Sequence, residues 1–248
     1  MKITDNIYIV GGGKWGFGIS QEIDCNIYIV DTGDGLVMID SGTGLEPERV
    51  DANIESHGFK VTDLKAIILT HYHGDHACGA ARFQKLTGAP IYAPELEADA
   101  IRNGDEIQTG LAGAKGGLYP IDFVYPKSEN VIAVGEGETL TVGNITFTFY
   151  MTPGHSLQDM VVFAEIDGKK CLFTGDFVFA QGMVLIQSLP DVSIYPYVEA
   201  MRKINELEFD AAFPGHGVFV LEGGHKFVEF ALAKFNVGLL PPVLYYFA

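Results

Sequence analysis

Four side chains that commonly bind metal ions lie close together in the segment THYHGDH (70–76): His71, His73, Asp75 and His76. Imidazole nitrogens and carboxylate oxygens are the usual ligands of zinc and related metals in catalytic sites. Four ligands from so short a segment are more than one ion needs, so the spacing predicts two adjacent metal ions. The non-functional alternative for this segment is a polar turn that caps a helix.

The elements expected around this motif can bring its side chains together. An apolar strand (66–69) precedes it, and a helix is expected to run on to about Leu86. Side chains two positions apart in extended backbone point the same way, so His71 and His73 can bind one ion. Gly74 permits a sharp turn, which lets Asp75 and His76 face back across it.

Three later segments each place a potential ligand after an apolar strand, with glycine directly before it. They are TPGH (152–155), FTGD (173–176) and FPGH (213–216). A histidine hydrogen-bonded in a loop, or an aspartate in a turn, is the alternative for any one segment taken singly. Their recurrence, which includes His155, Asp176 and His216, favours ligands that complete the two metal shells.

The ordered set of motifs resembles the metallo-β-lactamase superfamily. The similarity begins with CNIYIVDTGDGLVMIDSG (25–42) and continues through LTHYHGDH, TPGHS, FTGD and PGHG in the family's order. The resemblance implies an α/β fold, a four-layer αβ/βα sandwich with the metal site at one edge of the two sheets. It further implies one metal on His71, His73 and His155, a second on Asp75, His76 and His216, and Asp176 as a bridge between them.

The function implied is that of a hydrolase that uses a metal-bridging hydroxide to cleave a carbonyl-type bond, a thioester, ester, lactone or amide, of a small molecule. Paired divalent ions activate water and stabilise the oxyanion that forms. Asp75 is expected to bind metal and also to move a proton to the leaving group. Five imidazoles and two carboxylates favour two Zn²⁺ ions, with iron or manganese as alternatives.

At several positions this chain has a different residue from known branches of the family, and these differences help to narrow the reaction. A bridging Asp176, where many zinc β-lactamases have cysteine or serine, makes the chain resemble hydroxyacylglutathione hydrolases and lactonases. Phe179, however, stands where homoserine lactonases have tyrosine, and Lys226 and Lys234 are the only basic residues after His216. A β-lactamase-like amide hydrolase stays an alternative. So does a non-haem di-iron oxidoreductase, although such enzymes usually carry glutamate in the first motif.

Residues that contact substrate are expected on loops, because loops carry specificity in scaffolds of this kind. Trp15 and Phe17, in the glycine-rich turn 11–20, are candidates for a flap over the substrate. The alternative is an exposed hairpin tip with a ring folded onto the surface. Tyr119, in the loop 110–130, and Phe179 are further candidates for the substrate pocket.

The remaining pattern predicts strands followed by helices in each half of the chain, without a linker-like shift in composition. We therefore expect one domain, residues 1–248. Asp40 and Asp159 are interpreted as structural acceptors of hydrogen bonds in turns. Besides the strand 66–69 and the helix after His76, strands are expected at 6–10, 25–31, 36–39, 90–93, 139–142, 145–151, 161–166, 170–173 and 211–213, and helices at 46–56, 94–102, 193–207 and 226–235.

The composition and net charge of the chain limit the classes of molecule that it is expected to bind. A formal charge of −16, from 32 acidic and 16 basic residues, opposes binding to nucleic acid and to anionic membranes. No apolar run approaches the roughly 20 residues of a membrane span. Three widely spaced cysteines indicate reduced thiols, so a cytoplasmic location is expected. The apolar tail LLPPVLYYFA (239–248) is expected to pack on its own domain, with a homodimer contact as the alternative.

Overall fold

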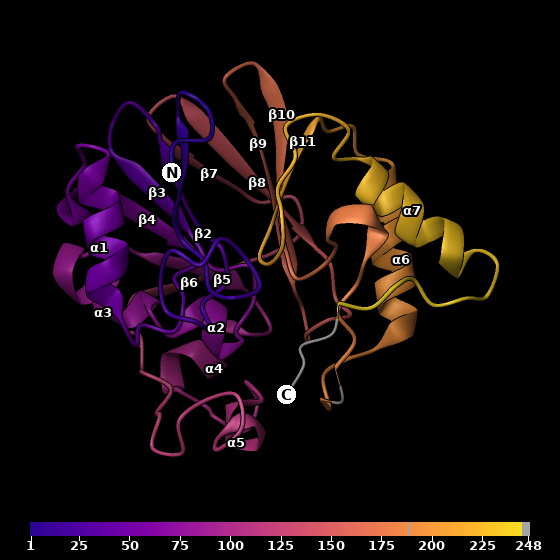
Figure 1. Ribbon diagram of the computed structural model, residues 1–248, viewed down its shortest axis with the longest axis horizontal. Coiled ribbons are helices and arrows are strands. Elements are labelled where there is room, and N and C mark those ends of the chain that lie inside the picture. Colours follow the sequence, from indigo (N-terminus) through magenta and orange to yellow (C-terminus); the bar gives the residue numbers. More distant parts are fainter. Residues whose placement is uncertain (188, 245–248) are drawn as a thin grey trace.

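The computed structural model describes residues 1–187 and 189–244. Two β-sheets lie against each other, and helices cover the outer side of each sheet (Figure 1). The layers therefore follow the order helix, sheet, sheet, helix. This is the predicted α/β fold, the four-layer αβ/βα sandwich.

The first sheet has six strands that lie side by side in their sequence order. The first three strands form an antiparallel meander, and the next three are parallel to the third. Helices α1 (Pro47–Ser56) and α3 (Ala80–Thr87) bury apolar side chains against the outer face of this sheet. The strands are β1 (Ile7–Gly11), β2 (Ile27–Asp31), β3 (Leu36–Ile39), β4 (Leu64–Ile68), β5 (Ile91–Pro94) and β6 (Val131–Val134).

The second sheet has five strands, antiparallel except for one parallel pair between β10 and β11. Helices α6 (Ile194–Asn205) and α7 (Lys226–Phe235) cover its outer face. In spatial order the strands are β11 (Ala211–Pro214), β10 (Lys169–Gly175), β9 (Met160–Ile166), β8 (Ile145–Met151) and β7 (Thr139–Val142).

The inner faces of the two sheets share one apolar core. The ring of Tyr28 in β2 lies 5.6 Å from the rings of Phe173 and Phe213, which belong to β10 and β11. Burial of each such side chain stabilises the fold by about 1.5–3 kcal/mol. The Tyr28 hydroxyl also donates a hydrogen bond to the carbonyl oxygen of Pro214, 2.9 Å away. These contacts fix the second sheet against the first beside the strand ends.

Two predicted helices differ from the structure. The helix expected to begin at Asp75 and His76 and to run to about Leu86 is divided into α2 (Gly74–Ala77) and α3, and at the break the chain at Gly79 packs against Ser41. A Cβ at Gly79 would lie 2.1 Å from the carbonyl oxygen of Ser41. The helix expected at 94–102 begins later, as α4 (Ala98–Asn103), because Pro94 still belongs to β5 and pairs with β6.

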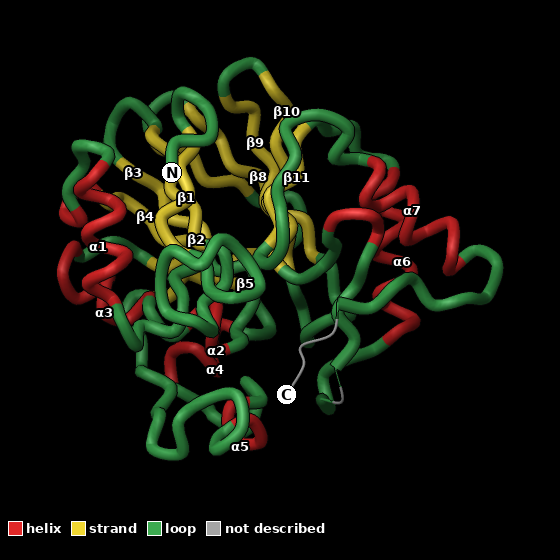
Figure 2. Tube along the Cα trace, viewed as in Figure 1, coloured by secondary structure: helices red, strands yellow, loops and turns green. Residues whose placement is uncertain are grey.

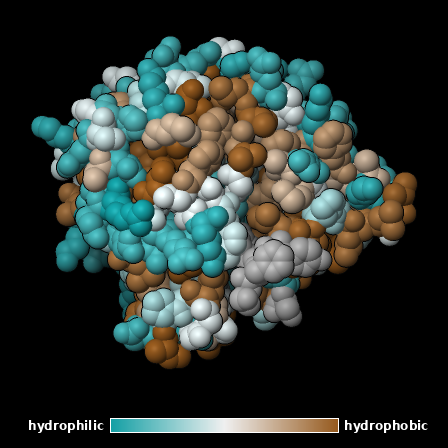
Figure 3. All heavy atoms as spheres, in the orientation of Figure 1, coloured by the Kyte–Doolittle hydropathy of each residue, from teal (hydrophilic) through white to brown (hydrophobic). Residues whose placement is uncertain are grey.

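Several short elements were not predicted. They are β6, which pairs with β5, the helix α5 (Leu111–Ala114) inside the expected loop, and single 3₁₀ turns at Val61–Asp63 and Ala180–Gly182. Each is too short to give a clear hydrophobic period. Apolar side chains gather at the surface around α5 (Figure 3), among them Ile107, Leu118 and Ile121.

The tail expected to pack on its own domain is described up to residue 244. Val243 forms a parallel bridge with Val184, and the backbone N–H of Leu244 donates to the carbonyl oxygen of Val184. The rest of this prediction, for residues 245–248, lies outside the described residues. The homodimer contact and the single domain stay predictions. None of the described helices has the length and hydropathy that crossing a bilayer requires.

Candidate metal centre

The structure brings all seven predicted metal ligands to one edge of the two sheets. Strands β4, β8, β10 and β11 end at this edge, where loops gather (Figure 2). Every ligand lies in the segment that follows one of these strand ends. They are His71, His73, Asp75 and His76 after β4, His155 after β8, Asp176 after β10, and His216 after β11.

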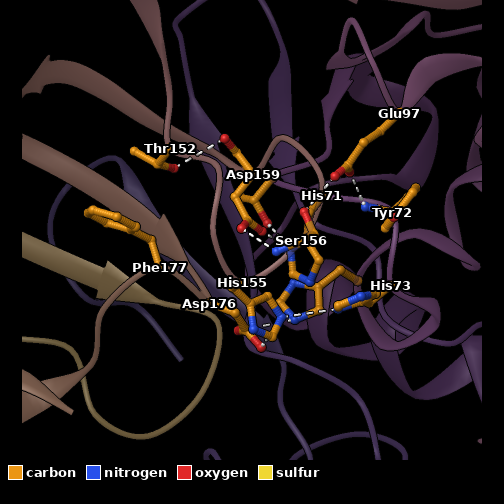
Figure 4. A network of polar contacts seen from close by, with 12 residues as sticks. His71, Tyr72, His73, Glu97, Thr152, His155, Ser156, Asp159, Asp176 and Phe177 are labelled. Carbon is orange, nitrogen blue, oxygen red and sulfur yellow. Dashed lines mark hydrogen bonds and ion pairs between the residues drawn. The ribbon is translucent and has the colours of Figure 1, made fainter. Parts of the chain in front are cut away.

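Three buried histidines form the first group. The ligand atoms of His71, His73 and His155 lie within 4.8 Å of one another, and their rings lie edge-on to each other in one cluster (Figure 4). His73 Nδ1 is 3.0 Å from His155 Nε2. His155 Nδ1 is 2.9 Å from the carbonyl oxygen of Leu185, to which it donates, so Nε2 carries a lone pair. The negative charge of Asp176 would raise the pKa of His155, but burial outweighs it and lowers this pKa to about 4. The imidazole of His155 is therefore neutral at pH 7.

Asp75, His76 and His216 form the second group, also within 4.8 Å. His216 Nε2 lies 3.2 Å from Asp75 Oδ2 and 3.3 Å from His76 Nε2. Burial alone would raise the pKa of Asp75, but the charge of His76 and the hydrogen bond from His216 outweigh burial and lower it to about 2. Asp75 is therefore ionised at neutral pH, as a metal ligand must be.

Asp176 lies between the two groups. Its Oδ2 is 3.4 Å from His216 Nε2 and 3.5 Å from His155 Nε2, and its Oδ1 is 3.3 Å from His76 Nε2. Burial raises the pKa of this carboxyl, yet the charges of His216 and His76 hold it well below its usual range. An ionised carboxylate that faces both groups has the position expected of a bridge.

The donor set fits divalent metal ions. His71 Nε2 is buried without a hydrogen-bond partner among the described residues, and burying a polar atom in this way is costly unless something binds it. Pairs of imidazole nitrogens face each other at 3.0 and 3.3 Å. Gly215 leaves the space that this crowding needs, since a Cβ there would lie 2.5 Å from His76 Cε1 and 2.6 Å from Asp176 Oδ1.

Asp40 orients one of the ligands, a role that the sequence interpretation did not include. Its Oδ1 accepts a hydrogen bond from the backbone N–H of Thr70, as expected, but its Oδ2 lies 2.8 Å from His76 Nδ1. A proton on Nδ1 leaves the lone pair of His76 on Nε2, the atom that faces Asp176 and His216. Cys25 lies close to the same two residues, so that Cys25, Asp40 and His76 form a further group of potential ligands.

A fully buried glutamate joins the loops that carry the first group (Figure 4). Glu97 accepts hydrogen bonds from the backbone N–H groups of Tyr72, at 2.8 Å, and Gln158, at 2.9 Å, and from the hydroxyl of Ser156, at 2.5 Å. Burial and the nearby Asp159 raise the pKa of Glu97. Sequence analysis missed this residue, because PELEAD contains three acidic residues and nothing in it distinguishes the buried one.

Two further aspartates lie behind the ligands. Asp159, as expected, accepts the backbone N–H of Ser156 at 2.7 Å, and its other oxygen lies 3.6 Å from His71 Nδ1. Asp191, which sequence analysis missed, accepts the Tyr72 hydroxyl at 2.7 Å and lies 3.5 Å from His73 Nε2. Carboxylates in these positions fix the orientation of metal-binding imidazoles.

A cavity of about 180 Å³ opens onto the metal-facing side chains, and Trp15 and Tyr119, two of the candidates for substrate contact, line it. The Trp15 ring lies edge-on to His216, with centroids 6.2 Å apart. Phe17 and Phe179 do not form the cavity wall, so their expected substrate contact needs correction. Phe17 is partly buried and stacks on Phe219 at the edge of the core, and Phe179 is buried with its ring 6.2 Å from that of His216.

Comparison with known proteins identifies the family. Residues 21–216 match the sequence model of the metallo-beta-lactamase superfamily. The chain belongs to this superfamily. A curated relative, the "atrochrysone carboxyl ACP thioesterase" of Aspergillus fumigatus, is 27% identical over 86% of this chain and 56% of its own length. The "lactamase-like protein adaB" of Aspergillus niger is 24% identical over 94% of this chain and 62% of its own length. The chain thus spans about three-fifths of the length of these relatives.

Solved structures of metallo-β-lactamases share the fold. BJP-1, a subclass B3 metallo-β-lactamase of Bradyrhizobium japonicum, superposes with a TM-score of 0.73 at 24% identity, covering 96% of this chain and 92% of its own. A B3 metallo-β-lactamase with an active-site glutamic acid gives 0.70 at 23% identity, covering 94% and 86%. The superfamily fold, with its metal site at the sheet edge, is therefore the scaffold on which this chain's side chains are placed.

Metal binding by this member of the metallo-β-lactamase superfamily is expected to release protons. Burial would lower the pKa of His216, but contacts with Asp176 and Asp75 outweigh burial and raise it to about 9. The metal-free protein therefore holds His216 protonated at pH 7, whereas a metal needs the neutral ring, so affinity should rise with pH up to about 9. Calorimetric titration with Zn²⁺ at pH 7 in buffers of different ionisation enthalpy should give different heats. Heats that do not depend on the buffer would contradict this assignment.

Proposed function

We propose that the protein is a dinuclear-metal-dependent hydrolase that cleaves a carbonyl-type bond of a small molecule: a thioester, ester, lactone or amide. The observation that carries the proposal is the convergence of seven metal-binding side chains beside a cavity of about 180 Å³. The thioesterase among the relatives favours a thioester. Zinc suits five imidazoles and two carboxylates, with iron and manganese as alternatives.

Each of the two groups of side chains would hold one metal ion. His71, His73 and His155 would hold one ion, Asp75, His76 and His216 the other, and Asp176 would lie between them. The ions, when bound, supply an activated water and a positive charge that polarises the substrate carbonyl. The chain orients the imidazoles through nearby carboxylates: Asp40 is hydrogen-bonded to His76, and Asp191 lies 3.5 Å from His73 Nε2.

Asp75 has the position needed to handle a proton beside the substrate. Its Oδ2 faces the second group of ligands, while its Oδ1 accepts a hydrogen bond from the Tyr119 hydroxyl at 3.1 Å. Both residues line the cavity. We assign Asp75 the role of receiving a proton at a carboxylate oxygen and passing it to the leaving group, with Tyr119 holding the carboxylate in place.

Tyr119→Phe tests this arrangement. A hydrogen bond to a charged group contributes about 1.5–3 kcal/mol, so we expect kcat to fall about tenfold or more while both metals are retained. The control is Tyr8→Phe. Tyr8 lies in β1, outside the site, and its hydroxyl donates a hydrogen bond to the carbonyl oxygen of Asp5. Turnover and metal content should be measured on both variants. An unchanged kcat in Tyr119→Phe would show that the hydroxyl does not position Asp75.

The proposed function is tested by elemental analysis of protein purified without added metal, followed by hydrolysis assays on thioesters, esters, lactones and β-lactams. We expect about two metal ions per chain and metal-dependent hydrolysis of at least one class. Iron alone, with no hydrolysis of any member of the panel, would overturn the proposal and favour an oxidoreductase.

We also propose that the physiological partner is a small molecule rather than nucleic acid or membrane. The formal charge of −16 supports this, because it repels phosphate groups. Free, buried thiols at Cys25, Cys78 and Cys171 are in keeping with the cytoplasm, which we propose as the location.

A further inference from the structure

The lining of the cavity combines charged or metal-facing side chains with apolar and neutral ones. His73, Asp75 and Asp176 are the metal-facing part of the lining. The rest of the lining is apolar or neutral and comes mainly from three separate segments of the chain. Its apolar members are Trp15, Leu111, Ala114, Leu118, Tyr119 and Leu189.

Two of these segments meet at the cavity. Gly110 lies so close to Leu189 that a Cβ at Gly110 would be 3.2 Å from Leu189 Cδ1. Leu111 is buried next to this contact, while Leu118 is 38% exposed and lies at the rim. The neutral polar side chains of the wall, Thr109 and Gln187, carry no charge. The segments around Gly110 and Leu189 therefore meet at the cavity, and the lining that they contribute is uncharged.

No lysine or arginine belongs to the described cavity lining. Two lysines occur next to lining residues in sequence, and both face carboxylates. Lys115 Nζ lies 2.6 Å from Glu106 Oε2. Lys14 Nζ lies 3.6 Å from Glu22 Oε1 and 4.4 Å from the centre of the Trp15 ring. A negative group held against this wall would lose its hydration and find no cation in the lining itself, because Lys14 and Lys115 already face carboxylates, and this loss is unfavourable.

We propose that this cavity binds an uncharged, apolar acyl group, bonded to the carbonyl carbon that the metal site attacks. The size of the cavity limits the group. An apolar protein cavity of about 150 Å³ binds benzene, so about 180 Å³ admits one aromatic ring or a chain of about six carbons. Benzoyl and hexanoyl groups fit this description, whereas acyl groups with a terminal carboxylate do not. That the acyl group is cleaved from its carbonyl-type bond rests on the proposed hydrolase function. That the group is apolar and uncharged rests on the residues that line the cavity.

Binding can be measured without turnover, because Trp15 is the single tryptophan of the chain and lines the cavity. The probes are two thioethers of N-acetylcysteamine, one with a hexyl chain and one with a hexyl chain that ends in a sulfonate. A thioether is not hydrolysed, and a sulfonate keeps its charge at pH 7 and binds metals weakly. We expect the neutral probe to change Trp15 fluorescence in the metal-loaded protein and to bind at least about tenfold more tightly than the sulfonate.

A charge introduced at the rim should reverse this preference. In Leu118→Arg we expect the sulfonate probe to bind at least about tenfold more tightly than it does to the wild type. Leu118→Met keeps the wall apolar and should leave the ratio of the two affinities unchanged. Equal or tighter binding of the sulfonate by the wild type would overturn the inference, as would no binding of the neutral probe. Selective binding of the neutral probe, with no hydrolysis of hexanoyl or benzoyl esters and thioesters, would instead contradict the proposed function alone.

Discussion

Asp176→Ala is expected to lower turnover by more than about 100-fold and to reduce the metal content of the purified protein. Removing a residue that only orients a metal ligand typically costs 10–100-fold, and Asp176 itself faces both groups of ligands. Its two oxygens lie 3.3–3.5 Å from ligand nitrogens of His76, His155 and His216. Without it, neither shell is complete and the two histidines of the second group lose their shared carboxylate. Steady-state kinetics and elemental analysis on the same preparations measure both effects.

The matched control is Asp210→Ala. Asp210 accepts a hydrogen bond from the backbone N–H of Lys170, near the start of β10, whereas Asp176 follows the end of the same strand. The control removes a carboxylate that bonds the opposite end of β10, away from the site, so its activity and metal content should stay near those of the wild type. An Asp176→Ala protein with full activity and two metals would show that Asp176 does not bridge the ions.

Asp40→Asn is expected to lower metal affinity and turnover about 10–100-fold while leaving the fold intact. The asparagine oxygen can still accept the N–H of Thr70, but its amide would present a donor to His76 Nδ1 in place of the carboxylate. His76 would then favour the tautomer with its proton on Nε2, the atom that must face the metal. Asp40 has a positive φ of 56°, a conformation that asparagine tolerates. Zn²⁺ titration and thermal unfolding of the metal-free protein separate the two effects.

Asp167→Asn controls for the backbone. Asp167 also has a positive φ, 53°, but it lies in the turn between β9 and β10, where its side chain accepts hydrogen bonds from Asn6. This variant should bind Zn²⁺ like the wild type. If Asp40→Asn does the same, the contact between Asp40 and His76 does not set the tautomer, and Asp40 is structural only, as the sequence alone suggested.

The candidate ligands could be found from sequence because their signal is local. The spacing of His71 and His73 reflects the two-residue period of extended backbone, and glycine precedes His155, Asp176 and His216 where the chain must approach a crowded site. Most strands, and the helices α1, α6 and α7, also followed from local apolar patterns. Short elements such as β6 did not, because their formation depends on pairing with a neighbour.

The THYHGDH segment therefore determined by itself which residue types the site would use and that two ions were expected. Tertiary structure decided which residues orient the metal ligands and which residues line the cavity next to them. Glu97 is hydrogen-bonded to Ser156, 59 residues away in the sequence, and Tyr119 to Asp75, 44 residues away. No periodic pattern in the sequence encodes such contacts. The apolar wall likewise exists only where Trp15 and Leu189 are brought to the same cavity. Ligand chemistry is a property of single residues and their near neighbours, whereas orientation and specificity arise from the packing of distant segments, which only the folded chain fixes.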